Sequence, residues 1–505
     1  PVTADSGRTI TFAETQPLPT YLFAFAAGRF SVETATRAGR TLRMLHRETD
    51  AGKVARNRDE VFDLHARALE WLESYTGIPY PFGKFDFVLI PSFQFGGMEH
   101  PGAILYNAAS VLLDPSATQN QRLGRASLIA HETSHMWFGD LVTMRWFDDV
   151  WMKEVFANFM AAKIVNPSFK EIDHDLRFLL AHYPAAYRVD RTAGTNAIRQ
   201  TLANLADAGQ MYGPIIYEKA PIVMRQLELA IGETPFRDGL RSYLHRLAFG
   251  NASWIDLVAL LDTASPRDVA SWSRAWVETR GRPVFATTVR TTRAKRLKSI
   301  ELTQRDPLGQ GRVWPQELVV TLAFPDGVRH VPVTVSGRTT RVRGVEGLAQ
   351  PDFVLPNGRG LGYGLFVLDE ASRRYLLAHV ESIPDALTRG SAWVTLWDNL
   401  LEARIPPPVF VDAAVRALPR ETDEQNTQRI LGYLTRTFWQ FLPESVRIER
   451  SRSLERLLRE GMARAATPGQ KAAWFNAYRD IVRSADGVAW LERVWRRQEP
   501  VEGLT

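Results

Sequence analysis

Two histidines four residues apart, His131 and His135, have the chemical type and the spacing of a metal-binding pair. Residues four apart on an α-helix project from the same face, so these two imidazoles can converge on one cation. Glu132 follows the first histidine directly and is available as a base. We therefore interpret this stretch as part of a catalytic zinc site. The alternative is a solvated helix that carries the three residues by chance, because the pentapeptide alone is weak evidence.

A catalytic zinc ion normally has three protein ligands and a fourth position for water, so the histidine pair needs one more donor. Glu154 is the candidate, nineteen residues after His135. It lies in the segment 149–160, whose apolar spacing predicts a second helix packed against the first. The separation leaves room for one loop and a return, which favours the metal site over the chance helix.

The length and composition limit the possible protein classes. A chain of 505 residues is too long for one core and predicts about three domains. Its formal charge of +6, from 62 Lys and Arg against 56 Asp and Glu, is spread along the chain and requires no acidic partner. The absence of Cys excludes disulfides and thiolate zinc sites, which leaves His and carboxylates as the strong metal ligands. No run approaches the roughly 18–20 apolar residues that span a bilayer, so we expect no transmembrane segment.

The N-terminal residues have the patterns of β-strands. Extended patterns at 8–12 and 21–25 are joined by a proline-containing turn at 16–19. Two strands do not make a stable sheet alone, so we expect them to end a β domain whose earlier strands lie outside this sequence. The chain starts at Pro1 and without a signal peptide, so we expect a soluble protein whose compartment, cytoplasmic or periplasmic and secreted, stays open.

The rest of the chain alternates between helical and extended patterns. A helical pattern begins near residue 56, and strands are predicted at 85–90 and 103–106, before helices that continue to about Trp276. Beyond Pro283 alternation predicts a small sandwich, with strands at 299–303, 317–324, 330–335 and 364–368. From about residue 370 the helical period returns. We therefore predict four parts: the end of an N-terminal β domain at 1–45, a catalytic domain at 46–283, a β-sandwich at 284–370 and an α-helical domain at 371–505.

Two further patterns suggest nucleotide or nucleic-acid binding, and we interpret both as structural. The Gly-rich piece 357–364 lacks the dinucleotide spacing and a Gly-Lys-Ser/Thr ending, so it is predicted to be a loop between strands. The Arg-rich helix at 447–464 has Glu455/Arg459 and Glu460/Arg464 pairs four apart, which is typical of a solvated face. No aromatic platform accompanies it, so we expect no nucleic-acid partner.

Several segments resemble the gluzincin aminopeptidases, the family of aminopeptidase N and the leukotriene hydrolase. The resemblance lies in the amino acids of these segments and also in their order and separation along the chain. These segments are 96–100, 131–146, 151–157, 217–220, 232–236 and 276–283. The resemblance covers the middle of the chain and, more loosely, the rest. It implies a bacterial member with a multidomain α+β fold: a thermolysin-like, mostly helical catalytic domain, a small β-sandwich and a C-terminal α-helical domain.

The resemblance also implies roles for the residues of the site. His131, His135 and Glu154 would hold one Zn²⁺ per chain, and Glu132 would be the general base. Zinc lowers the pKa of its water from 15.7 to about 7, and a carboxylate within reach takes the proton as the water attacks a peptide carbonyl. Tyr217 matches the family tyrosine whose phenol donates to the carbonyl oxygen as it becomes an oxyanion. The alternative is a core tyrosine, and the Glu-Lys-Ala that follows in the family order favours the catalytic role.

The family stretch that binds the substrate's amino end matches Gly96, Gly97, Met98 and Glu99. The resemblance implies that this stretch lies along an edge strand whose backbone pairs with the substrate. Glu99 would hold the free α-ammonium, so that only the first peptide bond reaches the metal. Without the motif, a lone Glu after a strand would more often be a surface residue. We therefore expect a zinc-dependent aminopeptidase that acts on peptides with a free N-terminus.

The sequence departs from the family pattern without losing a ligand, the base or the oxyanion donor. The departures are His100 for Asn, Lys153 for Asn, Val155 for Gly and Ala220 for Gly. The two departures beside Glu154, at Lys153 and Val155, could change the metal affinity or the pocket wall, so the side-chain preference is less certain than the reaction type. Other polar residues could orient the ligands or cap helices, namely Asp140, Asp148, Asp149 and Asn158.

Two other functions stay open at this stage. One branch of the family has epoxide hydrolase activity, and no residue excludes such an enzyme or a bifunctional relative. A non-catalytic peptide-binding protein would be expected to lose a ligand or the base, and none is lost. In the family a β domain precedes the catalytic domain and supplies a further polar residue near the substrate's amino group, so we expect this chain alone to be less active or less stable than a longer one. The preferred N-terminal side chain and the oligomeric state are not determined by the sequence.

Overall fold

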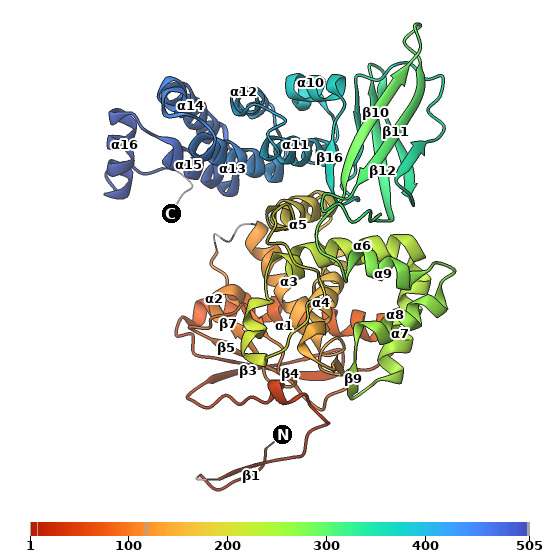
Figure 1. Ribbon diagram of the computed structural model, residues 1–505. Coiled ribbons are helices and arrows are strands. Elements are labelled where there is room, and N and C mark those ends of the chain that lie inside the picture. The colour runs from red at the N-terminus through yellow and green to blue at the C-terminus, as the bar shows by residue number, and fades with distance from the viewer. Residues whose placement is uncertain (1, 8, 116, 118, 502–505) are drawn as a thin grey trace. The chain divides into compact units, whose positions relative to one another are not determined.

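The computed structural model describes residues 2–7, 9–115, 117 and 119–501. Helices predominate and several small sheets accompany them (Figure 1), which confirms the predicted α+β class. The chain divides into two compact units, the first made of residues 1–171 and 196–279 and the second of 172–195 and 280–505. The predicted domain boundaries stay predictions.

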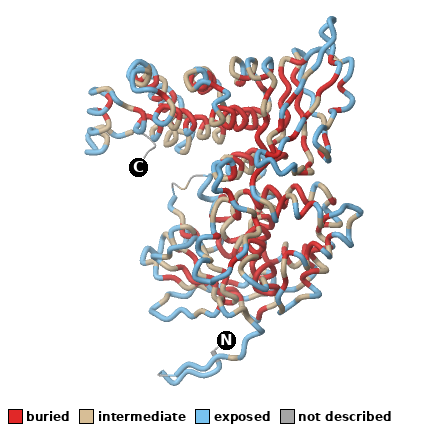
Figure 2. Tube along the Cα trace, viewed as in Figure 1, coloured by how far each residue is buried: buried red, intermediate tan, exposed pale blue. Residues whose placement is uncertain are grey.

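The N-terminal segment forms an exposed hairpin and then an irregular stretch. Strand β1 (Val2–Asp5) pairs with β2 (Ile10–Phe12), which confirms part of the predicted strand at 8–12; Arg8 lies outside the described residues. Figure 2 shows this hairpin as exposed. The predicted strand at 21–25 is wrong, because Thr20–Leu22 forms a single 3₁₀ turn, η1, and residues 23–25 form no strand. The proline before it has no N–H and a φ of −56°, which suits a turn rather than a ladder.

A five-stranded sheet lies at the base of the first unit, in the order β3-β4-β5-β7-β6. Its strands are β3 (Ser31–Arg37), β4 (Arg40–His46), β5 (Phe85–Ile90), β6 (Gly97–Met98) and β7 (Ile104–Asn107). The predicted strands at 85–90 and 103–106 are thereby confirmed. Since β6 is an edge strand that pairs only with β7, one side of its backbone faces away from the sheet.

The two helices of the predicted site lie side by side in this unit (Figure 1), as α3 (Gln119–His135) and α4 (Trp151–Val165). α4 is buried around most of its circumference, which is why its sequence is apolar on almost every face. Phe138, just after α3, stacks on Phe156 of α4 with ring centroids 5.2 Å apart. Gly139 turns the chain between them with a φ of 136°, and a Cβ there would lie 3.4 Å from His135 Nδ1. The predicted helix pair is confirmed.

The remaining helices and strands complete the first unit. They are α1 (Ala51–Thr76), α2 (Ala108–Val111), β8 (Val142–Met144), η2 (Phe147–Asp149), η3 (Asn166–Ser168), η4 (Leu205–Gln210), the π-helical turn η5 (Ile215–Lys219), α6 (Ala220–Ile231), α7 (Glu233–Arg246), β9 (Gly250–Ala252), α8 (Trp254–Ala264) and α9 (Val269–Trp276). Asp50 caps α1 by accepting from the Lys53 N–H, and Gly77 ends it with a φ of 72°. The last helix of this unit, α9, ends at Trp276, as predicted.

The second unit contains two facing sheets with one apolar core between them. One sheet has the order β14-β11-β10-β16 and the other β13-β12-β15. Their strands are β10 (Val284–Thr291), β11 (Leu297–Arg305), β12 (Gln316–Phe324), β13 (Gly327–Val335), β14 (Thr339–Val342), β15 (Phe353–Leu355) and β16 (Leu365–Val367). The predicted sandwich strands are confirmed, and the Gly-rich piece 357–364 is a loop between β15 and β16.

Helices make up the rest of the second unit. They are α5 (His174–Asp190), α10 (Glu370–His379), η6 (Val380–Ser382), α11 (Ala386–Leu401), α12 (Pro407–Ala417), α13 (Glu424–Gln440), α14 (Glu444–Arg464), α15 (Pro468–Ile481) and α16 (Ala485–Trp495). α5 joins this unit through buried polar contacts: Tyr183 donates to the Leu361 carbonyl at 2.9 Å, and Tyr363 donates to Asp190 at 3.0 Å.

The Arg-rich helix α14 differs in part from its prediction. Glu455 is buried rather than solvated, and its carboxylate accepts from the Arg483 N–H at 2.8 Å and the Ser484 N–H at 3.0 Å. Arg459 lies over the Trp490 ring, 4.2 Å from its centroid, instead of pairing with Glu455. The Glu455/Arg459 prediction is therefore wrong, because a tertiary contact takes precedence over the spacing along the helix.

The helices of the described residues differ in length and apolar character from membrane-spanning segments. None of them is both long enough and apolar enough to pass through a bilayer.

A buried histidine on α1 gives the stability of this protein a predicted pH dependence. Within the core, His65 donates from Nδ1 to the Val61 carbonyl at 2.8 Å, and its Nε2 accepts from the Tyr106 hydroxyl at 3.1 Å. Burial lowers the pKa of His65 to about 4, below its unfolded value of 6.5. The stabilisation is therefore fully present above pH 6.5 and is lost as the pH falls toward 4, by about 3 kcal/mol in all.

In His65→Gln the amide offers one donor and one acceptor to the same two partners and has no group that titrates. We expect the unfolding midpoint of the chelated wild type to fall more steeply between pH 6.5 and pH 4 than that of His65→Gln. The measurement is urea unfolding of the two proteins across this range. Parallel pH profiles would contradict the assignment.

Candidate metal and peptide site

A cavity of about 830 Å³ lies in the first unit, between α3, α4, the edge strand β6 and the turns η1 and η5. All nine site residues predicted from the sequence line it: Gly96, Gly97, Met98, Glu99, His131, Glu132, His135, Glu154 and Tyr217. The fold thus brings together residues that are separated by up to 121 positions in the chain, from Gly96 to Tyr217. Their chemical roles depend on the geometry within the cavity.

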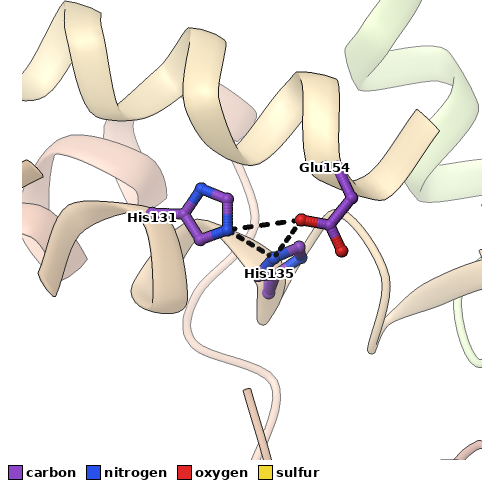
Figure 3. Close-up of side chains that lie close together, drawn as sticks. All are labelled: His131, His135 and Glu154. Carbon is purple, nitrogen blue, oxygen red and sulfur yellow. Dashed lines mark hydrogen bonds and ion pairs between the residues drawn. The ribbon is translucent and has the colours of Figure 1, made fainter. Parts of the chain in front are cut away.

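The three predicted metal ligands converge on one point (Figure 3). His131 and His135 project from α3, Glu154 projects from α4, and their ligand atoms lie within 4.8 Å of one another. The two Nε2 atoms are 3.1 Å apart, and Glu154 Oε2 is 3.5 Å from His131 Nε2 and 3.9 Å from His135 Nε2. One carboxylate oxygen and two imidazole nitrogens match the ligand set of a catalytic zinc ion.

The outer nitrogen of each imidazole is already engaged. His135 Nδ1 lies 3.1 Å from the Phe138 carbonyl, and His131 Nδ1 lies 3.0 Å from Asn158 Oδ1. A carbonyl oxygen only accepts, so each Nδ1 carries the proton and each Nε2 presents its lone pair to the shared point. Two lone pairs this close repel each other unless a cation lies between them. The donor set therefore fits a divalent metal.

Electrostatics favours the metal-binding protonation state of His135 and Glu154. Burial lowers the pKa of His135 to about 4, which keeps its ring neutral. Burial alone would raise the pKa of Glu154, but Lys153 and the two histidines hold it well below its usual value. Burial alone would lower the pKa of His131, but Glu154 and Glu132 raise it, so zinc competes with a proton for this imidazole.

Glu132 is placed to exchange protons beside this cluster. Its side chain is buried and lines the cavity, and its Oε2 has no hydrogen-bond partner among the described residues. Burial raises the pKa of Glu132 to about 8, against the effect of His131 and with support from Glu99 and Glu154. A carboxyl group whose pKa lies near the operating pH can both take up and return a proton, and the unpaired oxygen is free to contact a water.

Gly97 is required by the position of this carboxylate. A Cβ built on Gly97 would lie 2.3 Å from Glu132 Oε1, closer than any side chain allows. The backbone of β6, with Gly97 opposite Tyr106 and Met98 opposite Leu105, therefore passes directly beside Glu132. An extended peptide added to this edge would be held next to the base.

Tyr217 also lines the cavity, from the π-helical turn η5 that leads into α6. Such single turns occur frequently at functional sites. Burial raises the pKa of Tyr217 above its usual value, with a further contribution from Glu154, so its phenol keeps its proton and can donate. Its ring stacks with that of Tyr212 at a centroid distance of 6.3 Å.

Glu99 has a partner that the sequence did not reveal. Lys153 Nζ lies 2.5 Å from Glu99 Oε1 and 3.0 Å from Glu154 Oε1, and all three side chains are less than 10% exposed. Burial alone would raise the pKa of Glu99, but His135 and Lys153 lower it to about 2, so it is charged. The sequence marked Lys153 only as an unusual neighbour of Glu154. Its pairing with a residue 54 positions away carries no local signal.

Tyr21 and Tyr212 are among the other cavity residues that were not predicted. Tyr21 belongs to the segment wrongly predicted as a strand, and the Lys153 ammonium lies 5.3 Å from the centre of its ring. Residue 22, its neighbour, is fixed by His100, whose Nδ1 donates to the Leu22 carbonyl at 3.0 Å. This turn therefore forms part of the cavity wall.

Of the four polar residues that could orient the ligands, Asn158 is the one found on a ligand among the described residues. Asp148 and Asp149 instead pair with Arg199, at 3.2 Å and 2.6 Å. Asp140 is buried beside the site, and burial raises its pKa well above the usual value. Asn158 and the Phe138 carbonyl are therefore the groups that orient the two histidine ligands.

Comparisons with known proteins agree with this geometry. Residues 60–276 match the peptidase family M1 domain. The chain is 28% identical over 461 residues to aminopeptidase N of Streptomyces lividans, covering 88% of this chain and 54% of that protein. It is 31% identical over 369 residues to the puromycin-sensitive aminopeptidase of Caenorhabditis elegans, covering 72% and 38%. It is 30% identical over 286 residues to the leucyl aminopeptidase of Saccharolobus solfataricus, covering 56% and 36%. The chain spans about half the length of these relatives or less.

Proposed function

Because this chain belongs to the M1 family of peptidases, we propose that it is a zinc-dependent aminopeptidase that hydrolyses the first peptide bond of peptides with a free N-terminus. One Zn²⁺ per chain is held by His131, His135 and Glu154. The proposal includes a thermolysin-like catalytic domain within 46–283. The observation that carries it is the convergence of the two Nε2 atoms and Glu154 Oε2 beside the unpaired oxygen of Glu132.

Each residue of the site has a separate role in the proposed reaction. Zinc, when bound, supplies a polarised water as nucleophile. Glu132 accepts the proton of that water as it attacks the carbonyl carbon, and then delivers the proton to the nitrogen of the leaving amine. Tyr217 donates a hydrogen bond to the carbonyl oxygen as negative charge develops on it. The hydrolysis consumes one water and one peptide bond and forms a carboxylate and an amine. The proton that Glu132 takes from the water ends on the amine.

Substrate orientation follows from the edge strand and Glu99. The backbone of Gly97 and Met98 pairs with an extended peptide, and the Glu99 carboxylate receives the free α-ammonium. A peptide fixed at its amino end presents its first bond to the base, which makes the cleavage exopeptidic.

The test is hydrolysis of a panel of aminoacyl fluorogenic amides, each matched with its Nα-acetylated form, together with measurement of zinc content. We expect about one zinc per chain, release of fluorophore from the free amines, little release from the acetylated forms, and loss of activity on chelation that zinc restores. A protein without zinc or with chelator-insensitive release would overturn the proposal. Equal rates on acetylated and free substrates would overturn its exopeptidase part.

Tyr217→Phe tests the oxyanion donor. Loss of one such donor costs about 10²–10³ in kcat, so we expect that decrease with zinc content and KM nearly unchanged. The matched control is Tyr212→Phe, which removes a hydroxyl from the neighbouring ring in the same cavity. If Tyr217→Phe and Tyr212→Phe lose activity equally, Tyr217 is a packing residue.

A further inference from the structure

Lys153 occupies the position on Glu99 that the proposed mechanism gives to the substrate. Its ammonium lies 2.5 Å from Glu99 Oε1, in a pair whose side chains are 7% and 4% exposed. The same ammonium lies 3.0 Å from Glu154 Oε1, whereas the other oxygen of that carboxylate, Oε2, is the one near the histidines. The carboxylate expected to bind an α-ammonium therefore already holds an internal ammonium.

A peptide's α-ammonium cannot simply be added to this pair. Two ammonium groups on one carboxylate repel each other, and the repulsion is strong in a buried site where water does not screen it. If the α-ammonium takes Glu99, the Lys153 ammonium needs another acceptor, since a buried charge without a full set of partners is costly. Glu154 alone is a poor acceptor, because its other oxygen is committed to the metal.

The substrate itself can supply the missing acceptor. A first residue with a carboxylate on its side chain carries an anion close to its own α-ammonium. Since Glu99 and Lys153 are in contact, such a residue can pair with both at once, α-ammonium to Glu99 and side-chain carboxylate to Lys153. One internal ion pair is then exchanged for two with the substrate, whereas a neutral side chain leaves Lys153 undercompensated.

The rest of the cavity supports this assignment. Among the described residues that line it, Lys153 is the one Lys or Arg. Three carboxylates also line the cavity, and the proposed mechanism assigns Glu99 to the α-ammonium, Glu154 to the metal and Glu132 to the water. The Tyr21 ring lies 5.3 Å from the ammonium. An anionic side chain in this cavity therefore has a single cationic side chain to recognise it.

We propose that Lys153 is a specificity-determining residue and that the site favours peptides whose first residue is Asp or Glu, through contact of that carboxylate with Lys153 Nζ. This inference rests on the proposed aminopeptidase function. Lys153 contacts the substrate's first side chain, while Glu99 holds its α-ammonium. An aminopeptidase without a cation at this position would lack the preference.

The first experiment compares Glu-, Asp-, Leu- and Ala-aminomethylcoumarin on the zinc-loaded wild type, Lys153→Met and Lys153→Asn. We expect the wild type to favour Glu and Asp over Leu in kcat/KM by about tenfold or more, the effect of one charge-assisted contact. Both variants should lose this preference, mainly through KM, and gain in kcat/KM for Leu. The matched control is Lys163→Met on the same helix, where the lysine pairs with Glu228 at 2.7 Å and does not line the cavity.

The wild type alone can overturn the inference, so the outcome does not depend on a variant that folds or keeps its zinc. A wild type that cleaves Leu or Ala substrates as well as or better than Glu and Asp substrates contradicts it. So does an acidic preference that persists unchanged in zinc-loaded Lys153→Met. If instead none of the free-amine substrates is cleaved by zinc-loaded wild type, the proposed function itself has failed.

A second measurement separates binding from turnover. Calorimetric titration of Glu132→Gln with the peptides Glu-Ala-Ala and Leu-Ala-Ala should show about tenfold or tighter binding of the acidic peptide. The double variant Glu132→Gln/Lys153→Met should bind the two peptides equally. Equal affinities in Glu132→Gln with Lys153 present would refute the contact.

Discussion

Glu132→Gln will retain its zinc and lose turnover by about 10²–10⁴-fold, the contribution of a positioned general base. The amide has the shape of the carboxylate but cannot accept the water proton. Its oxygen and nitrogen fit the same space beside Gly97, where Glu132 Oε1 already limits the approach of the backbone. The loss should therefore fall on kcat rather than on metal affinity or KM. The measurements are zinc content and steady-state kinetics with one free-amine substrate.

The control for this prediction is Glu70→Gln, which removes a carboxylate from an exposed position on α1, a helix outside the cavity. Glu70→Gln should leave kcat and zinc content unchanged. If Glu132→Gln kept more than about a tenth of the wild-type kcat, another group would have to be the base. If it lost its zinc, the low activity would carry no information about proton transfer, and the metal content identifies that case.

The local part of the site could be predicted from the sequence because local geometry determines it. His131, Glu132 and His135 lie within five consecutive residues of one helix, and helical spacing alone puts both imidazoles on one face. Glu154 required only a second apolar helix at a short distance, and α4 is that helix. The assignment of these residues as ligands and base stays a prediction until metal is measured.

The contacts that the sequence did not predict join distant segments. The Lys153–Glu99 pair connects α4 with the loop after β6, and the turn containing Tyr21 was predicted as a strand because Tyr and Phe alternate there. Phe23 and Phe25 in that segment are 80% and 77% exposed, so no sheet covers them. Propensity predicts which segments could pair, but burial in the folded chain decides which do.

His135→Ala is expected to lose the metal and, with it, all measurable hydrolysis. The imidazole is almost completely buried, its Nδ1 is fixed by the Phe138 carbonyl, and its Nε2 is one of three converging donors. Alanine removes that donor, and no other His lines the cavity among the described residues except His131. Two ligands do not hold zinc in a three-ligand site, so zinc content after dialysis against a weak chelator should fall to background.

Asn158→Ala provides the graded comparison for the ligand set. Asn158 accepts from His131 Nδ1 and does not itself face the converging Nε2 atoms. Loss of such a supporting hydrogen bond typically lowers metal affinity or activity about 10–100-fold, so added zinc should restore Asn158→Ala but not His135→Ala. Zinc titration with a competing chromophoric chelator measures both affinities. Normal zinc content in His135→Ala would show that the metal lies elsewhere, whereas equal loss in the two variants would show that the helix pair, rather than the donor set, limits binding.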